Sequence, residues 1–303
     1  MDARDRPVLV TGASGYIGGK VVDALLERGI PVRAMSRNPE RLSRLGERGV
    51  EVVAGDVMDR SSLRMALDGV FAAYYLIHSM GGRGSERTFV EYDRFAAQNF
   101  ALEGRNLERV IYLGGLGRHD DDLSPHLRSR LEVGQILQSG PAPVTILRSG
   151  IVIGAGSASW TMLLSLVRRL PVMLTPRWVD TRSQPIAVND VIGYLMAALD
   201  NPRTAAKSYE IGGPDVLTYR QMMEQTAAIV GKRPLIVGVP VLTPQLSAYW
   251  VDFVTPVPAS IAHPLIEGLR NEAIVHDDAA QQDMPIALTS FEAAVKIALR
   301  RGT

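Results

Sequence analysis

Three glycines at regular spacing near the start of the chain are typical of a phosphate-binding turn. Gly12, Gly15 and Gly18 stand between the short β-branched run at residues 8–10 and a stretch with helical spacing of apolar residues. Gly12 allows a sharp turn off a strand, Gly15 leaves room for a pyrophosphate, and Gly18 lets a helix pack closely on the strand. The N–H groups and partial positive charge at the helix N-terminus favour the phosphates. We therefore predict that this turn binds a dinucleotide.

The end of the next predicted strand decides which dinucleotide is preferred. Ser36 and Arg37 follow the strand pattern of residues 31–35, and no carboxylate occurs before Glu40. A carboxylate here would accept hydrogen bonds from the ribose of NAD, whereas a guanidinium favours the 2′-phosphate of NADP. A solvated arginine at a strand end is the alternative interpretation. The sequence favours NADP(H) over NAD(H).

A third predicted strand, residues 50–54, is followed by Asp56 and Val57. In an open parallel sheet, ligands lie outside the carboxyl ends of the strands. We therefore expect Asp56 to accept a hydrogen bond from the adenine amino group and Val57 to lie against the ring.

The elements that must position these residues alternate along the chain. Strand patterns and helical patterns alternate six times, which predicts an α/β fold with a Rossmann-type doubly wound parallel sheet and helices on both faces. The second part of the chain is less regular and is expected to be mostly helical. We predict a dinucleotide-binding domain at 1–150, which also takes in parts of 180–215, and a smaller substrate or partner domain at 151–303. The predicted strands are residues 8–10, 31–35, 50–54, 70–77, 109–113 and 144–147.

Several details of these elements can also be predicted. Ser61 is expected to cap a helix at 61–67, and Asn189 or Asp190 to cap a helix at 191–199. The stretch 234–264 is rich in proline, aliphatic and aromatic residues, which indicates either core packing or the wall of a substrate pocket.

Composition excludes several classes of function. The 303 residues include 33 Lys plus Arg against 32 Asp plus Glu, so we expect binding neither to nucleic acid nor to an anionic membrane. The chain has no cysteine, which excludes thiolate metal sites and cysteine nucleophiles, and the histidines lack a metal-ligand spacing. No apolar run reaches the roughly 18 residues of a membrane span. We expect a cytoplasmic protein without a metal, with a homo-oligomer or a protein partner left open.

These motifs resemble the short-chain dehydrogenase/reductase superfamily, in its atypical, NmrA-like and extended branches. The resemblance rests on the glycine spacing, on Gly55-Asp56, on the Tyr-Leu-Ile-His at 75–78 and on Gly212-Gly213-Pro214, and it covers nearly the whole chain. Residues 148–154 resemble the segment that carries the nicotinamide in extended members. The cofactor contacts that motif and resemblance together imply are Gly12, Ser14, Gly15, Tyr16, Ile17, Gly18, Ser36, Arg37, Asp56, Val57, Ile77, His78, Ser79, Leu113, Gly114, Arg130, Gly150 and Ile151.

The chain departs from standard members of the superfamily at the catalytic positions. Those members have a serine or threonine after the fifth strand and a Tyr-x-x-x-Lys on the next helix, whereas this chain has Gly114-Gly115 and no Tyr-x-x-x-Lys. In the register of that motif, His126 falls on the tyrosine position and Arg130 on the lysine position. In one interpretation His126 donates a proton, since its unperturbed pKa of about 6.5 suits neutral pH, and Arg130 holds the ribose. In the other, His126 has no catalytic role and Arg130 binds only the cofactor or an acidic neighbour. Other groups that could face the nicotinamide are Ser129, Tyr74, Tyr92 and His78.

The resemblance implies an NADP(H)-dependent oxidoreductase acting on a small, fairly apolar carbonyl or enone-type compound. The replaced catalytic residues leave open a second function, that of a non-catalytic, NmrA-like cofactor sensor or assembly factor. A sugar-nucleotide epimerase ranks lower, because it needs the tyrosine and lysine that are missing here.

Overall fold

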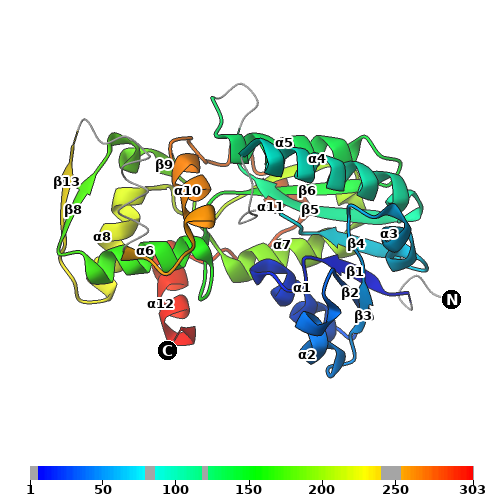
Figure 1. The fold of residues 1–303 in the computed structure, drawn as a ribbon. Coiled ribbons are helices and arrows are strands. Elements are labelled where there is room, and N and C mark those ends of the chain that lie inside the picture. Colours follow the sequence, from blue (N-terminus) through cyan, green and yellow to red (C-terminus); the bar gives the residue numbers. More distant parts are fainter. Residues whose placement is uncertain (1–5, 79–85, 118–121, 240–253, 303) are drawn as a thin grey trace.

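The computed structural model describes residues 6–78, 86–117, 122–239 and 254–302. Within these ranges, seven parallel strands form one sheet in the order β11-β6-β5-β4-β1-β2-β3. The order reverses direction at β1, which is the topological switch point of a doubly wound sheet. The predicted Rossmann-type α/β fold is confirmed (Figure 1). The strands are β1 (Val8–Thr11), β2 (Val32–Ser36), β3 (Glu51–Ala54), β4 (Ala72–Tyr75), β5 (Arg109–Gly115), β6 (Val144–Ser149) and β11 (Ser208–Ile211).

Helices cover both faces of the sheet, and each face has its own apolar core. Buried side chains of α1 and α7 pack on one face, and those of α3, α4 and α5 pack on the other. The strands of the sheet are therefore buried on both sides, which explains their continuous apolar runs. The helices around the sheet are α1 (Tyr16–Glu27), α2 (Ser43–Gly46), α3 (Arg60–Leu67), α4 (Glu86–Glu103), α5 (Pro125–Gln138), α7 (Val188–Asp200) and α11 (Ala279–Asp283).

A second lobe lies at the carboxyl ends of the strands and has a separate core (Figure 1). It contains three two-stranded pairs, among the described residues, and the helices that pack on them. Thr218 caps one of these helices with a complete capping box, in which Gln221 bonds back to the backbone of Thr218. The elements are β7 (Val152–Ile153), α6 (Ala158–Arg169), β8 (Val172–Thr175), β9 (Arg182–Ser183), β10 (Ile186–Ala187), β12 (Leu217–Thr218), α8 (Tyr219–Ile229), β13 (Leu235–Gly238), α10 (Ala259–Gly268) and α12 (Phe291–Arg301).

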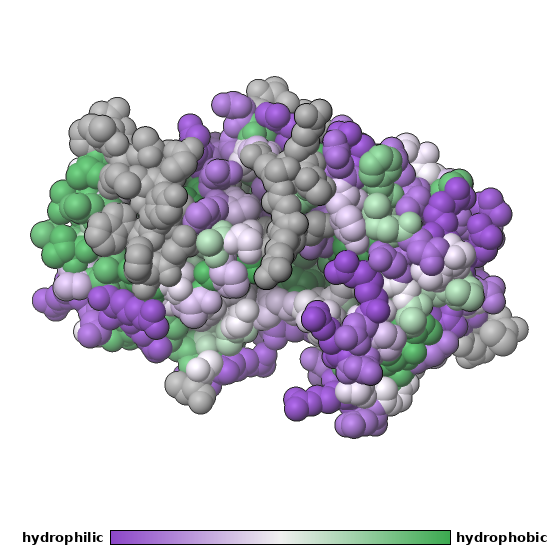
Figure 2. Space-filling view, viewed as in Figure 1, coloured by the Kyte–Doolittle hydropathy of each residue, from purple (hydrophilic) through white to green (hydrophobic). Residues whose placement is uncertain are grey.

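The far end of the second lobe presents an apolar face to solvent. Strands β8 and β13 pair in parallel, and the alternate residues on one side of the pair are exposed. Figure 2 shows this apolar surface at the left edge of the molecule. The exposed side chains are Val172, Leu174, Leu235 and Val237.

Three sequence expectations about the elements need correction or fall outside the description. Asp59 rather than Ser61 caps α3, and its carboxylate accepts the N–H of Ser61. The helix expected at 191–199 begins earlier, at Val188, so neither Asn189 nor Asp190 is its cap. Asp190 instead accepts hydrogen bonds from Thr289. Most of the aromatic part of the 234–264 stretch, residues 240–253, lies outside the described residues.

Candidate functional site

The glycine turn between β1 and α1 is closely packed against the backbone. Gly12 has φ +70°, and a Cβ there would come within 2.6 Å of the carbonyl oxygen of Leu76. A Cβ on Gly18 would overlap the carbonyl oxygen of Gly12. The Thr11 hydroxyl donates to the carbonyl of Tyr74 at 3.0 Å and accepts from the N–H of Leu76 at 3.1 Å, which fixes β1 to β4. Only glycine fits at 12 and 18.

The N-terminus of α1 has the features of an anion site. Its N-cap is Gly15, in an extended conformation, and no side chain caps the helix. Ser14 and Gly15 are exposed, so the first N–H groups, those of Tyr16 and Ile17, can meet a phosphate. The residues present therefore fit the pyrophosphate of a dinucleotide, which would be held by the backbone of residues 14–17.

The residues predicted to choose between NADP and NAD lie at the end of β2. The Ser36 hydroxyl closes a local turn with the backbone of Asn38. Arg37 is exposed and forms no ion pair within the described part of the chain. Arg33, by contrast, is tied to Glu51 at 2.8 Å and to two backbone carbonyls. Arg37 is thus an exposed guanidinium at the end of β2, where the sequence predicts the choice between NADP and NAD.

Asp56 and Val57, which are predicted to bind the adenine, follow β3 at the carboxyl edge of the sheet. Asp56 Oδ1 accepts the N–H of Met58 at 3.0 Å, and the Val57 side chain is buried. Burial raises the pKa of Tyr92, and the negative charge of Asp56, its hydrogen-bond partner, adds to that rise, whereas Arg37 opposes it. Tyr92 thus lies within reach of both groups that are predicted to bind the adenosine half of the cofactor.

At the carboxyl ends of β4 and β5, two histidines and an aspartate form a hydrogen-bonded chain. His78 Nε2 lies 3.1 Å from His126 Nδ1, and the ring centroids are 4.6 Å apart. His78 Nδ1 lies 3.4 Å from the Asp93 carboxylate, to which the Ser129 hydroxyl donates at 3.4 Å. His126 is positioned by α5, which Ser124 caps and Pro125 begins. His126, Asp93 and Ser129 are all buried.

Burial sets the charge state of this chain. It lowers the pKa of His126 to about 2, with further lowering by His78 and by the Arg130 guanidinium. It also lowers the pKa of His78, together with Arg130, while Asp93 opposes the change. Both imidazoles are therefore neutral at pH 7. The unperturbed pKa of about 6.5, on which one interpretation of His126 relied, therefore does not apply to this buried residue.

Arg130 is engaged with the sheet in this structure. Its guanidinium donates to the carbonyl of Leu113 and lies over the Tyr112 ring, 5.7 Å from the centroid. The Tyr112 hydroxyl in turn donates to the carbonyl of Arg130 at 3.0 Å. The absence of a side chain at Gly115 makes room for Leu127 of the same helix, since a Cβ at 115 would come within 2.8 Å of Leu127 Cδ2.

Most of the predicted site residues lie at the carboxyl edge of the sheet, whereas Tyr74 does not, and Ser79 lies outside the described residues. Gly150 and Ile151 lie in the link between β6 and β7, and the carbonyl of Ile151 accepts from Ile186. Leu113 and Gly114 are buried within β5, Ile77 precedes His78 after β4, and Ser79 lies outside the described residues. The Tyr74 hydroxyl donates to the carbonyl of Leu195 on the α7 face, so it does not face the edge.

The sequence reasoning missed Asp93. It stands on α4 at positions i−3, i−4 and i−7 from the buried residues Ala96, Ala97 and Phe100. A carboxylate on the apolar stripe of a helix is uncommon unless it has a partner. The position of Asp93 among apolar residues on one face of the helix could therefore have identified it as a candidate site residue.

Comparison with known proteins identifies the family. The model of the NmrA-like family matches residues 4–243. The chain belongs to the NmrA-like family. This NmrA-like chain is 31% identical over 232 residues to (4-alkanoyl-5-oxo-2,5-dihydrofuran-3-yl)methyl phosphate reductase of Streptomyces griseus, covering 75% of each chain. It is 27% identical to the mitochondrial NADH dehydrogenase [ubiquinone] 1 alpha subcomplex subunit 9 of Arabidopsis thaliana, over 97% of this chain and 78% of that protein.

Solved structures of low sequence identity share the fold of this NmrA-like chain. Citrobacter triphenylmethane reductase complexed with NADP(H) superposes with a TM-score of 0.75 at 20% identity, over 96% of this chain and 99% of that one. The NADPH-dependent quinone oxidoreductase of Escherichia coli gives a TM-score of 0.74 at 18% identity, over 95% and 98%. Both agree with the atypical short-chain dehydrogenase/reductase architecture.

Two kinds of feature are absent from the described residues. They contain no group of three or more His, Asp or Glu side chains arranged to hold a metal ion. None of their helices combines the length and apolarity needed to cross a bilayer.

Proposed function

We propose that this protein is an NADPH-dependent reductase of a small, apolar acceptor with a conjugated carbonyl group. The observation that carries the proposal is the buried chain Asp93–His78–His126, which lies at the same sheet edge as the glycine turn. A purely structural carboxylate would not need two linked imidazoles. The 31% identity to a reductase whose named substrate is the phosphate ester of an unsaturated lactone supports the conjugated carbonyl of the acceptor.

The cofactor preference rests on the end of β2. Arg37 is exposed and without an ion pair among the described residues, and a bound 2′-phosphate would supply its counter-ion. When bound, the cofactor would supply the hydride. The protein's own residues must then orient the acceptor and deliver a proton.

The histidine chain is suited to moving that proton, because its members are linked through opposite ring nitrogens. With Asp93 ionised, His78 Nδ1–H donates to it, His126 Nδ1–H donates to His78 Nε2, and His126 Nε2 carries a lone pair. With a proton on Asp93, every bond reverses and His126 Nε2 carries the proton. His126 would thus give a proton to the acceptor while Asp93 gives up its own, and no isolated imidazolium needs to form in the buried site.

A second candidate function is a non-catalytic cofactor-binding subunit or sensor. Arg130 is already bound to the carbonyl of Leu113 in this structure, and glycines replace the usual catalytic serine. The similarity to a subunit of mitochondrial NADH dehydrogenase supports this alternative. The exposed apolar face of β8 and β13 offers a surface for a protein partner.

Two measurements test these functions. Protein fluorescence titrated with NADPH and with NADH tests cofactor binding, and we expect NADPH to bind at least tenfold more tightly. Stopped-flow NADPH oxidation with a panel of quinones, enones and unsaturated lactones tests turnover. For His126→Asn we expect kcat to fall about 10²-fold or more, the usual range for general acid catalysis, with the NADPH Kd unchanged within twofold. Tight NADPH binding without turnover on any acceptor would favour the second candidate, and no binding of either nucleotide would contradict both.

A further inference from the structure

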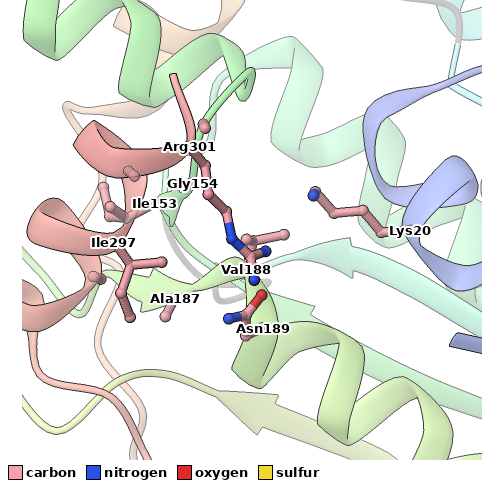
Figure 3. Close-up of a pocket in the computed structure, with 11 residues that line it drawn as sticks. Lys20, Ile153, Gly154, Ala187, Val188, Asn189, Ile297 and Arg301 are labelled. Carbon is pink, nitrogen blue, oxygen red and sulfur yellow. The ribbon is translucent and has the colours of Figure 1, made fainter. Parts of the chain in front are cut away.

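A cavity of about 260 Å³ lies where the two lobes meet, on the α1 and α7 side of the sheet. Its walls come from α1, the N-terminus of α7 and α12, and from the ends of β7 and β10 with the residues that follow β7. Figure 3 shows Lys20 reaching in from α1 and Arg301 reaching down from α12 toward Asn189. The lining residues are Lys20, Ile153, Gly154, Ala155, Ala187, Val188, Asn189, Ala294, Ile297, Ala298 and Arg301.

Within the described part of the chain, no carboxylate pairs with the cations of this cavity. Lys20 and Arg301 are its only charged lining residues, and neither forms an ion pair with another described residue. Asp23, one turn after Lys20 on α1, pairs with Arg48, and Asp190, which follows Asn189, accepts hydrogen bonds from the backbone and hydroxyl of Thr289. Lys20 is half-buried and Arg301 is exposed, so water partly screens their mutual repulsion, and an anion between them would relieve what remains.

The cavity also offers neutral donors to an anion. The N-cap of α7 is Ala187, whose side chain cannot cap the helix, and the helix runs for 13 residues. Its first N–H groups and the Asn189 amide therefore add to the attraction of Lys20 and Arg301. The apolar remainder of the wall, such as Ile153 and Ile297, excludes water from one side.

We propose that this cavity binds a small dianion of the phosphate class, either inorganic phosphate or a phosphate monoester of small size. The charges fit, because two cations match the two negative charges of such a group, and the volume admits a molecule a few atoms larger than phosphate. The ligand would connect Lys20 of the dinucleotide lobe with Arg301 at the end of the chain, and so hold the two lobes together.

None of the residues that line the cavity belongs to the predicted dinucleotide turn at 12–18, and the Tyr16 side chain lies beside the cavity. Lys20 Nζ lies 5.2 Å from the centroid of that ring, and the Tyr16 hydroxyl is buried against Gly154 without a hydrogen-bond partner among the described residues. The Tyr16 backbone belongs to the glycine turn, whereas its side chain lies beside the cavity. An anion in the cavity would therefore leave the turn free for the cofactor.

Calorimetric titration with sodium phosphate, and separately with glycerol 3-phosphate, tests the proposal on the full-length protein at constant ionic strength. We expect millimolar or tighter binding at one site, weakened at least tenfold in Lys20→Gln and in Arg301→Gln. The control Lys296→Gln removes a cation of α12 that pairs with Glu292 and does not line the cavity, so binding should stay within twofold. Stronger binding of one probe would identify free phosphate or a monoester as the ligand source.

The same titration with saturating NADPH separates this site from the cofactor turn. Phosphate bound at the turn would be displaced by NADPH, whereas phosphate in the cavity would remain. If NADPH does not bind, the proposed function fails, but the Lys20 and Arg301 variants still test the cavity. Equal phosphate binding in all variants, or no heat of binding in the wild type, would overturn the proposal.

Discussion

His78 Nε2 and His126 Nδ1 lie 3.1 Å apart, although 48 positions separate the two residues in the chain. Neither ring can choose its tautomer alone, since a proton on one nitrogen requires a lone pair on the other. The Asp93 carboxylate lies 3.4 Å from His78 Nδ1, and its protonation state decides which group donates and which accepts in each of these hydrogen bonds. Asp93 is thereby a positioning residue for His126.

Replacing Asp93 by asparagine should disturb the reaction without removing the fold. The amide introduced by Asp93→Asn can donate to His78 Nδ1 and so stabilise the reversed tautomers, but it cannot release a proton. We expect kcat to fall at least tenfold in this variant between pH 6 and 9, with KM and the NADPH Kd within twofold of the wild type. The matched control is Gln98→Ala, an exposed change on the same helix. Equal losses of kcat and NADPH affinity would show that Asp93 stabilises the folded structure and has no specific role in proton transfer.

The role of Arg37 can be measured as a ratio of affinities. A charge-assisted hydrogen bond to a phosphate contributes roughly 1.5–3 kcal/mol, which corresponds to about 10- to 100-fold in Kd. In Arg37→Gln we expect NADPH binding to weaken by that factor while NADH binding is unchanged. Arg44→Gln, an exposed arginine on α2, should change neither. A parallel loss of both nucleotides would place Arg37 away from the 2′-phosphate.

Two adjacent glycines of α1 should respond in opposite ways to alanine. A Cβ at Gly18 would overlap the Gly12 carbonyl, whereas a Cβ at Gly19 meets nothing closer than the Ala13 carbonyl oxygen at 3.6 Å. Gly19→Ala should raise the free energy of unfolding by about 0.5–1 kcal/mol through helix propensity. Gly18→Ala should lower it and weaken NADPH binding, because the turn must shift. Urea denaturation and fluorescence titration measure both, and a stable Gly18→Ala protein with normal affinity would contradict the packing argument.

The buried histidines should make stability depend on pH in a defined window. Their folded pKa values lie below the ordinary value of 6.5, so the unfolded chain binds these protons first. The stability gained from neutral imidazoles is complete above about pH 6.5 and is lost as the pH falls toward the folded values, by on the order of 1.4 kcal/mol per pH unit for His126, with a further loss in the same direction from His78. Urea midpoints from pH 7.5 to 5 measure this slope. His126→Asn should flatten it, and an unchanged slope would exclude His126 as its source.

Local signals in the sequence predicted much of the fold. The glycine spacing could be recognised without tertiary information, because at Gly12 and Gly18 it reflects a backbone requirement that only glycine meets. Thr218 was also recognisable as a cap, because its partner Gln221 is three residues away. Such features depend on contacts between near neighbours, which the order of residues contains directly.

Features that depend on distant contacts could not be predicted in the same way. The pairing of His78 with Asp93 needs the positions of β4 and α4, and the low pKa of His126 follows from burial that no motif records. The helix α7 begins directly after Ala187, the last residue of β10. Its N-terminus has no polar cap residue from which the start could be predicted. Asp190 resembled a cap, but its role is to hold Thr289, 99 residues later.

The chain passes repeatedly between the two lobes, and the links are very short. Only residues 150 and 151 separate β6 from β7, and α7 begins at the residue after β10 ends. Strand β11 then returns to the edge of the main sheet beside β6. Any swing of one lobe against the other would have to break strand pairs or bend a helix. We therefore expect a single cooperative unfolding transition rather than two. We also expect the separation between the two lobes to be fixed by these short links, without a hinge between the lobes.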